Sequence, residues 1–334
     1  MDRYSGQTNI GLIGLAGQAK LSSATVTILG CGALGTVAAD LLVRAGVGRV
    51  RIIDRDVVEL GNLQRQTLFV ESDVLARIPK AQAAQERLRQ VNSEVVVEGH
   101  VVDFSGLNAL PLLQGSDAVI DATDNYLARF TLNEACLALN IPWVYGGALG
   151  TGGAIAVFTP EGPCFRCLFA ELPVAGAGES CAVTGVLASV TTVVAALQVA
   201  EIIKLLTGNS PLLGILQLEL AKGEFHNQPL EQDPQCPACQ LRQHEFLGQG
   251  KHVGAAAVCG QNSVLLSGST GECALDLLAA RLRARGYNPE SSRFRLRILT
   301  SEGLEFVIFA DGRALVYGTT SIALAQSVYN SILG

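Results

Sequence analysis

The sequence predicts an α/β protein built on a doubly wound, mostly parallel sheet. Three observations favour this fold. Short runs of β-branched and aliphatic residues alternate with amphipathic stretches from residue 24 to residue 145, as in βαβ units. A glycine-rich turn joins the first run to the first amphipathic stretch. The 334-residue chain is 49% hydrophobic and 16% charged, which suits one large core and a smaller one.

The strands of the main sheet are predicted at Ala24–Gly30, Arg49–Asp54, Glu94–Glu98, Ala118–Asp121 and Trp143–Tyr145. Apolar residues at spacings of three and four predict the intervening helices at Leu34–Ala45, Lys80–Asn92 and Tyr126–Asn140. A strand-like run, Ala154–Pro160, follows them. The next helix, Val186–Leu206, is apolar nearly all round, so we expect it to be buried, in a position compatible with a subunit interface.

Two domains are predicted, residues 1–245 and residues 246–334. The stretch that follows a proline-containing cysteine pair, as far as Val253, is typical of a linker. Beyond it the pattern indicates a small α+β domain, with a helix, three strands and a second helix at Cys273–Arg285, Phe294–Leu299, Leu304–Phe309, Ala314–Tyr317 and Ser321–Ile332.

Charge and composition argue against several classes of protein. The net charge of −6 disfavours broad binding to nucleic acid. The first residues lack the layout of a secretory signal, and polar residues or glycines interrupt every long apolar stretch, so we expect no membrane span and a cytoplasmic protein. In a cytoplasmic chain of this length, nine cysteines indicate metal binding or catalysis rather than disulfide bonds.

The glycine-rich turn predicts a nucleotide site. Gly30, Gly32 and Gly35 form a G-x-G-x-x-G pattern of the Rossmann-like kind, which brings phosphate to a helix N-terminus. Asp54, about twenty residues beyond, is suited to accept hydrogen bonds from ribose hydroxyls. By itself this pattern is also compatible with an NAD-dependent oxidoreductase.

Several further motifs carry a resemblance to a known family. They are the run Asp54–Gln66, Lys80, the triplet Thr123–Asn125 and the run Trp143–Gly150. Together with two cysteine pairs, they make residues 20 to 240 similar to the ThiF/MoeB/HesA adenylyltransferases, bacterial relatives of ubiquitin-activating enzymes. The resemblance implies an adenylyltransferase that uses ATP to activate the C-terminal glycine carboxylate of a small ubiquitin-like sulfur-carrier protein ending Gly-Gly, for thiamine, molybdopterin or a related product.

The resemblance also implies roles for individual residues. Asp54 holds the ribose, Asn62 and Gln66 orient the triphosphate, and Asp124 positions Mg²⁺. Arg65 and Lys80 hold the triphosphate, since charge grows on its oxygens when pyrophosphate leaves. The alternative is that Arg65 and Lys80 are ordinary solvated charges on the protein surface, with no role in binding.

Alternatives also remain for residues near Asp124. This carboxylate precedes a predicted helix, so it could be a helix cap, or capping and metal binding could be split between neighbours. Asp121 and Arg129 are less certain site residues, and Arg129 could pair with a carboxylate at the surface.

Two C-x-x-C pairs, Cys164 with Cys167 and Cys236 with Cys239, predict a structural zinc site. Four thiolates suit tetrahedral zinc and leave no open coordination position for catalysis. Two disulfides or a dithiol redox centre are the alternatives.

The remaining cysteines divide into one candidate and several packing residues. By resemblance, Cys181 follows a crossover loop and is a candidate for a covalent bond to the carrier, although it could equally pack near a helix start. Cys31 and Cys136 are predicted to be small packing residues. No cysteine loop of the rhodanese type is evident in the last domain, so we expect a separate sulfur donor protein.

One position departs from the family pattern. The resemblance implies a homodimer in which an arginine near the N-terminus reaches the partner's ATP, but Gly6 stands at that position. Either Arg3 or another cation substitutes, or adenylation is slower, or the chain only binds a ubiquitin-like partner or modified peptide.

Overall fold

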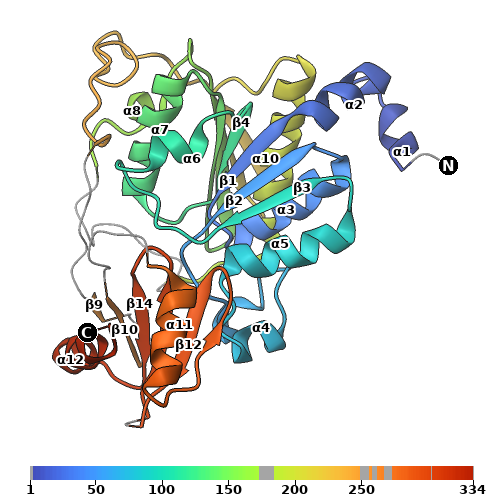
Figure 1. Ribbon diagram of the computed structural model, residues 1–334. Coiled ribbons are helices and arrows are strands. Elements are labelled where there is room, and N and C mark those ends of the chain that lie inside the picture. Colours follow the sequence, from blue (N-terminus) through green and yellow to red (C-terminus); the bar gives the residue numbers. More distant parts are fainter. Residues whose placement is uncertain are drawn as a thin grey trace. The chain divides into compact units, whose positions relative to one another are not determined.

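The chain folds into two compact units, Met1–Gly250 and Lys251–Gly334 (Figure 1). The computed structural model describes residues 3–172, 184–248, 256–257, 262–266, 273–301 and 303–333. Each unit has its own hydrophobic core.

An eight-stranded sheet forms the centre of the first unit, in the order β3-β2-β1-β4-β5-β6-β7-β8. Its strands are β1 (Thr25–Leu29), β2 (Arg49–Ile53), β3 (Val96–His100), β4 (Ala118–Asp121), β5 (Trp143–Leu149), β6 (Gly152–Phe158), β7 (Ile215–Glu219) and β8 (Glu224–Gln228). Strands β1 to β5 pair in parallel, and β5 to β8 pair antiparallel. The chain leaves β1 toward β2 on one side and returns to β4 on the other, so the switch point of a doubly wound fold lies at β1 and β4.

Helices cover both faces of this sheet (Figure 1). They are α1 (Ser5–Thr8), α2 (Gly14–Ser23), α3 (Ala33–Ala45), α4 (Glu71–Leu75), α5 (Lys80–Val91), α6 (Ala109–Leu113), α7 (Tyr126–Leu139), α8 (Phe165–Leu168) and α10 (Ala188–Thr207). Residues of α3, α5 and α10 share one core cluster, while residues of α6, α7 and α8 share the other. The prediction of a doubly wound α/β fold is therefore confirmed.

The predicted boundaries differ from the structure mainly where strands pair locally. Strand β5 continues four residues beyond the predicted Trp143–Tyr145, because it forms a hairpin with β6 through Gly150 at φ +58°. Strands β7 and β8 were not predicted. Every residue of β8 is exposed, so that strand lacks the buried alternation by which a strand is recognised.

Helix α10 is buried on one face only, although its sequence is apolar nearly all round. Among the described helices it is the one with the length and composition of a membrane span, and 44% of that window is buried. It packs on the sheet and on α3. The predicted burial is therefore met within the unit by the face that packs on the sheet and on α3, and a subunit interface at the rest of the helix stays a prediction.

The second unit is an α+β structure with a six-stranded antiparallel sheet in the order β11-β12-β13-β14-β10-β9. Its elements are β9 (Ala256–Ala257), β10 (Ser263–Leu266), α11 (Leu275–Ala284), β11 (Glu290–Ser291), β12 (Arg295–Leu299), β13 (Glu305–Phe309), β14 (Ala314–Tyr317) and α12 (Ile322–Leu333). Apolar residues of both helices and of β10, β12, β13 and β14 share one core. The predicted helices and three strands are present, and β9, β10 and β11 are additional.

A buried carboxylate fastens the end of the first unit to α7. Glu134 has no exposed surface, and its two oxygens accept the backbone N–H groups of Glu245, Phe246 and Leu247 at 2.9, 2.7 and 3.1 Å. Three donors satisfy a charge that would otherwise be costly to bury. Glu134 thus holds the last described segment of this unit in place.

Replacing Glu134 by alanine should lower the free energy of unfolding by about 1–3 kcal/mol, because three partly buried backbone N–H groups lose their charged acceptor. Urea unfolding measures the change, and limited proteolysis should cut sooner near Phe246. Glu201→Ala is the matched control, since Glu201 is also buried but accepts one backbone N–H, that of Leu212. Equal losses in the two variants would contradict this role.

Candidate nucleotide site and cysteine cluster

The glycine turn lies between the end of β1 and the start of α3. Gly30 has φ +95°, and a Cβ added there would lie 2.6 Å from the carbonyl oxygen of Ala122. A Cβ on Gly35 would lie 2.0 Å from the carbonyl oxygen of Gly30. Packing therefore requires both glycines. At Gly32 the nearest atom to an added Cβ is Nε2 of Gln66, at 3.9 Å, so this glycine borders open space at the helix N-terminus.

Asp54 joins the glycine turn to the end of β2. Its Oδ2 accepts the backbone N–H of Cys31 at 2.6 Å, and its Oδ1 accepts that of Asp56 at 2.7 Å. Burial raises the pKa of Asp54 above the usual carboxyl value, while the nearby charge of Lys80 opposes that rise. Each oxygen retains a lone pair for a further donor such as a ribose hydroxyl.

Lys80 is a buried cation among carboxylates. It is the first residue of α5, it is 7% exposed, and its Nζ lies 3.2 Å from Oδ2 of Asp56. Burial alone would lower the pKa of Lys80, but Asp56, Asp54 and Glu59 outweigh this and raise it. The ammonium group is therefore charged at neutral pH, and the alternative of a solvated surface lysine is wrong.

Arg65 has a weaker local anchor. Its Nη1 donates to the carbonyl oxygen of Gly61 at 3.1 Å, and the side chain is half-buried. This contact lies within one turn of chain, so the alternative of a partly solvated surface arginine remains open for Arg65.

Asn62 and Gln66 form a bonded pair beside the glycine turn. Asn62 ends the short helix Leu60–Asn62, and the N–H of Gln66, one turn further on, donates to the carbonyl oxygen of Asn62 at 3.0 Å. Nε2 of Gln66 also donates to Oδ1 of Asn62 at 2.7 Å. Asn62 in turn donates to Glu59 at 3.3 Å. Gln66 is 4% exposed, and among the described residues its buried Oε1 has no hydrogen-bond partner. An acceptor of this kind fits a site built for a donor from a bound molecule.

After β4, one residue caps helix α7 and its neighbour presents an exposed carboxylate. Asn125 caps α7 through a bond from the N–H of Ala128 to its Oδ1, at 2.9 Å. Asp124 is exposed and lies within the electrostatic reach of Arg55, whose guanidinium also lies 3.1 Å from Asp103. Asp124 is therefore not the cap, and its carboxylate is accessible to a cation.

Asp121 and Arg129 form a buried pair, so the alternative in which Arg129 pairs with a carboxylate at the surface is wrong. Asp121 is fully buried and Arg129 is 8% exposed, with Nε of the arginine 3.1 Å from Oδ2 of the aspartate. Arg129 also donates to the carbonyl oxygens of Thr123 and Gly146 at 2.7 and 3.3 Å. These contacts fix the turn that leads to Asp124.

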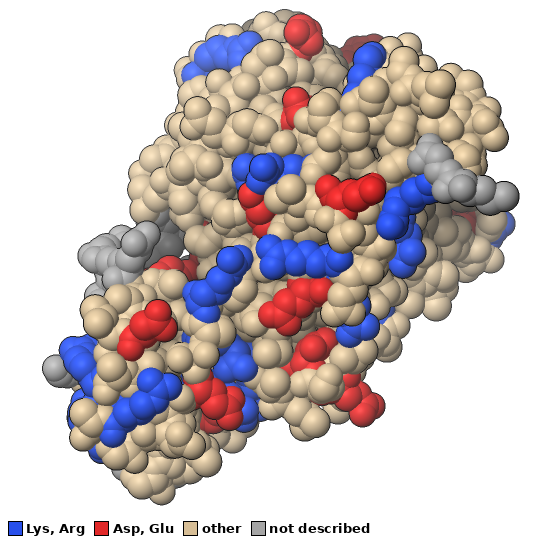
Figure 2. All heavy atoms as spheres, turned by 45° about the vertical axis from the view of Figure 1, so that its right-hand side comes forward, with Lys and Arg blue, Asp and Glu red and all other residues tan. Residues whose placement is uncertain are grey.

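Three charged residues near this site had been given no role from the sequence. Asp56 and Glu59 both interact electrostatically with the ammonium group of Lys80. The guanidinium group of Arg55 interacts in the same way with Asp103 and Asp124. The Asp-Arg-Asp sequence directly after β2 could have indicated a role for two of them, Arg55 and Asp56, because polar residues that follow parallel strands lie together at the carboxyl edge of the sheet. On the face displayed in Figure 2, basic and acidic side chains are interspersed, with no broad area of a single sign.

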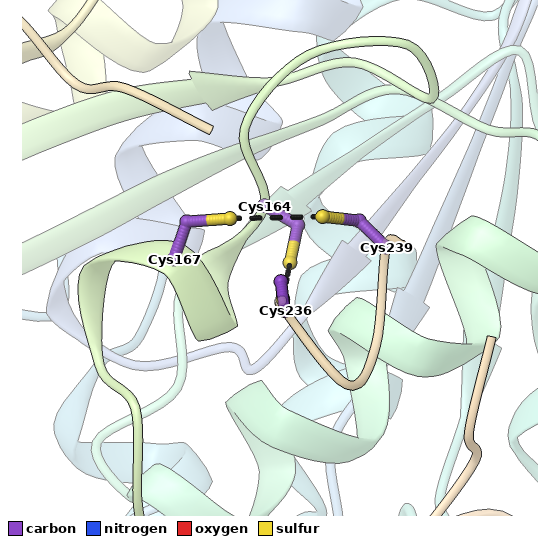
Figure 3. A group of neighbouring side chains, drawn as sticks. All are labelled: Cys164, Cys167, Cys236 and Cys239. Carbon is purple, nitrogen blue, oxygen red and sulfur yellow. Dashed lines mark hydrogen bonds between the residues drawn. The ribbon is translucent and has the colours of Figure 1, made fainter. Parts of the chain in front are cut away.

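The two C-x-x-C pairs come together as one cluster (Figure 3). The sulfurs of Cys164, Cys167, Cys236 and Cys239 all lie within 4.8 Å of one another. The Cys164–Cys236 and Cys167–Cys239 pairs are 3.6 Å apart, too far for disulfide bonds of about 2.05 Å. Tetrahedral zinc with bonds of about 2.3 Å requires sulfurs about 3.8 Å apart. The four side chains therefore fit zinc, and the disulfide alternative is wrong for this arrangement.

The other predicted cysteines fall in different settings. Cys31 and Cys136 are fully buried, as expected of packing residues. Burial raises the pKa of both thiols. Cys181 lies outside the described residues.

Comparison with known proteins agrees with this arrangement. The ThiF family model matches residues 4–238. The sulfur carrier protein ThiS adenylyltransferase of Bacillus subtilis is 40% identical over 99% of each chain. The sulfur carrier protein adenylyltransferase of Thermus thermophilus is 40% identical over 72% of this chain and 90% of its own, and the SAMP-activating enzyme E1 of Haloferax volcanii is 37% identical over 72% and 88%.

Solved structures support the same fold. The crystal structure of E. coli MccB with MccA-N7isoASN superimposes with a TM-score of 0.64 at 24% identity, over 72% of this chain and 74% of that one. The family model spans the glycine turn, the charged cluster around Lys80 and three of the four cysteines, and it ends one residue before Cys239. On this evidence the chain belongs to the ThiF family.

Proposed function

We propose that this protein is an adenylyltransferase that uses ATP to activate the C-terminal glycine carboxylate of a small ubiquitin-like sulfur-carrier protein. A carboxylate oxygen attacks the α-phosphorus, the bond to the β-phosphate oxygen breaks, and the products are the acyl adenylate and pyrophosphate. The observation that carries the proposal is the 40% identity over 99% of both chains to the sulfur carrier protein ThiS adenylyltransferase of Bacillus subtilis.

The proposed nucleotide site uses the geometry around the glycine turn. Phosphates lie against the turn at Gly30, Gly32 and Gly35, where the open side of Gly32 leaves room for them. Asp54 accepts from the ribose. Asn62 and Gln66 orient the nucleotide, and Oε1 of Gln66, which has no hydrogen-bond partner in the described part of the chain, is available to it.

Arg65 and Lys80 neutralise the negative charge of the triphosphate. Lys80 stays protonated and has little side-chain freedom to lose, which suits a preorganised electrostatic role. Asp124 would hold Mg²⁺, which when bound neutralises phosphate charge as a Lewis acid. The exposed carboxylate of Asp124 supports this assignment.

The proposed metal centre is structural zinc on Cys164, Cys167, Cys236 and Cys239. Two residues come from the segment around α8 and two from the segment after β8, so the ion would tie these distant parts of the chain together. The adenylation activity belongs to residues 1–245, and residues 246–334 form a separate small domain. We place the enzyme in the cytoplasm, as a homodimer served by a separate sulfur donor, with Cys181 as the candidate for covalent transfer.

A second candidate function, partner binding without catalysis, is favoured by one observation. Gly6 replaces the family's arginine, and Arg3 donates to the carbonyl oxygen of Val91 at the end of α5 in its own chain. Loss of one charged contact in a transition state costs about 3 kcal/mol, or roughly a hundredfold in rate. We therefore expect slower adenylation than in relatives with the arginine.

The test is ATP–pyrophosphate exchange. The protein with Mg²⁺ and a carrier ending Gly-Gly should exchange labelled pyrophosphate into ATP, whereas a carrier with an amidated terminus should not, because it lacks the attacking carboxylate. A binding-only homologue would retain the carrier but give no exchange. Saturable binding of NADH, with none of ATP·Mg, would instead indicate an oxidoreductase and contradict the proposal.

A further inference from the structure

An asparagine outside the cysteine pairs contacts one of the four sulfurs. Asn133 lies on α7 and has no exposed surface. Its Oδ1 accepts the backbone N–H of Phe165 at 2.9 Å, and its Nδ2 lies 3.6 Å from Sγ of Cys164. Because a backbone N–H can only donate, the carbonyl end of the amide must face Phe165 and the NH₂ end must face the sulfur.

A glutamine contacts a second sulfur in the same way. Nε2 of Gln232 donates to the carbonyl oxygen of Gly162 at 2.9 Å and lies 3.6 Å from Sγ of Cys239. Because a carbonyl can only accept, the amide orientation is again fixed, and the second N–H of the group points at the sulfur. Two amides from different segments therefore present donors to the cluster.

Backbone groups complete the set of donors. The N–H of Asp233 lies 3.5 Å from Sγ of Cys167, and the N–H groups of Ala238 and Cys239 donate to Sγ of Cys236. Every sulfur of the cluster thus accepts at least one N–H. Four thiolates around one Zn²⁺ carry an excess of negative charge, and donors of this kind stabilise it and hold each sulfur in position.

We propose that Asn133 and Gln232 are positioning residues of the metal centre, whose side-chain N–H groups set its affinity for zinc. The proposal rests on the zinc centre proposed above, and goes beyond it by assigning affinity to two residues outside the C-x-x-C pairs. Outer contacts of this kind typically change metal affinity by about 10- to 100-fold.

The first test replaces Asn133 by aspartate. The Asn133→Asp variant keeps an acceptor for Phe165 but presents an oxygen to the sulfur in place of a donor. Asn92→Asp is the matched control, because Asn92 is 1% exposed, accepts the N–H of Glu94 at 3.2 Å and donates from Nδ2 to Tyr4 at 2.9 Å, remote from the cluster in sequence. Both variants lose buried donors, but only one of them faces a sulfur.

Zinc affinity is measured on the full chain by competition with a chromogenic chelator, and the cobalt-substituted protein is examined for its thiolate charge-transfer band. Zinc should bind about 10- to 100-fold more weakly to Asn133→Asp than to the wild type, with a shifted cobalt band, and normally to Asn92→Asp. Equal affinities in Asn133→Asp and the wild type, or equal weakening in both variants, would overturn the proposal.

Gln232→Met provides a test that does not depend on a buried position, because Gln232 is only half-buried and methionine preserves its length without its donors. Gln240→Met, at an exposed position of the same loop, is its control. Weaker zinc binding in Gln232→Met alone supports the proposal, and unchanged binding contradicts it. These measurements need no carrier and no ATP, so their failure is distinct from failure of pyrophosphate exchange.

Discussion

Replacing Lys80 by alanine should abolish ATP–pyrophosphate exchange, with a loss of at least about 100- to 1000-fold. The variant loses the buried cation that would meet the triphosphate and leaves Asp54, Asp56 and Glu59 as an uncompensated negative cluster that repels it. Folding should survive, because the side chain of Asp56 is 55% exposed and water can replace the lysine there. Asp124→Ala should also lose exchange, since that carboxylate is exposed and is not the helix cap.

The control for Lys80 is Lys20→Ala. Lys20 is an exposed lysine whose Nζ donates to the carbonyl oxygen of Thr207 at 3.0 Å, so its removal costs a surface contact and nothing at the nucleotide site. Thermal melting of all variants separates loss of chemistry from loss of fold. Normal exchange by Lys80→Ala would show that the glycine turn and its charged neighbours do not bind the triphosphate.

Loss of the zinc centre should be the largest change in stability. A Cys239→Ser variant should purify with far less than one zinc per chain and should unfold at a temperature roughly 10–20 °C lower, as expected for a net loss of about 5 kcal/mol. The physical reason is that four metal bonds would tie two segments far apart in sequence, which are otherwise joined by a few contacts such as the Gln232–Gly162 hydrogen bond and the Arg166–Glu245 ion pair. Metal analysis and calorimetry measure both effects.

Cys136→Ser is the matched control for this experiment. Cys136 is equally buried, but it lies on α7 outside the cluster, so the variant should retain its zinc and lose little stability. A Cys239→Ser protein that keeps both zinc and its unfolding temperature would rule out a structural role for the four cysteines.

The order of elements in the first unit could be predicted from sequence because each carries a local signal. Strands β1 and β4 are buried nearly throughout, so they appear as short runs rich in β-branched and aliphatic residues, and Gly30 marks the turn that follows β1. Strand β2 instead alternates half-buried arginines with buried aliphatic residues. Strand β8 carried no such signal, since its residues are all exposed and its pairing with β7 alone makes it a strand. For helix α10 the apolar sequence could not show which face packs within the unit, because nearly all of its faces are apolar.

In the candidate site, too, some features could be predicted from local sequence and others could not. Asp54, Lys80 and Asp124 could be selected from their positions in the motifs, but their environments could not. The burial of Lys80 and its ion pair depend on Asp56, which is distant in sequence. That Asn125 rather than Asp124 caps α7, and that Asp121 pairs with Arg129 in the interior, involve residues closer in sequence but depend on how the turn after β4 packs. Asn133 had no sequence signal beyond being a polar residue on a mostly apolar helix.

The sequence by itself determined which residue types are available: the glycines of a G-x-G-x-x-G turn, the carboxylates and cations beyond the strands, and two pairs of thiols with metal-binding spacing. These follow from covalent order, because turn geometry and strand alternation act over a few residues. Only the tertiary structure decided which charges are desolvated and which amide faces which sulfur. Burial and electrostatic strength depend on atoms brought within a few ångströms of one another by packing, and such distances are not written in the local sequence.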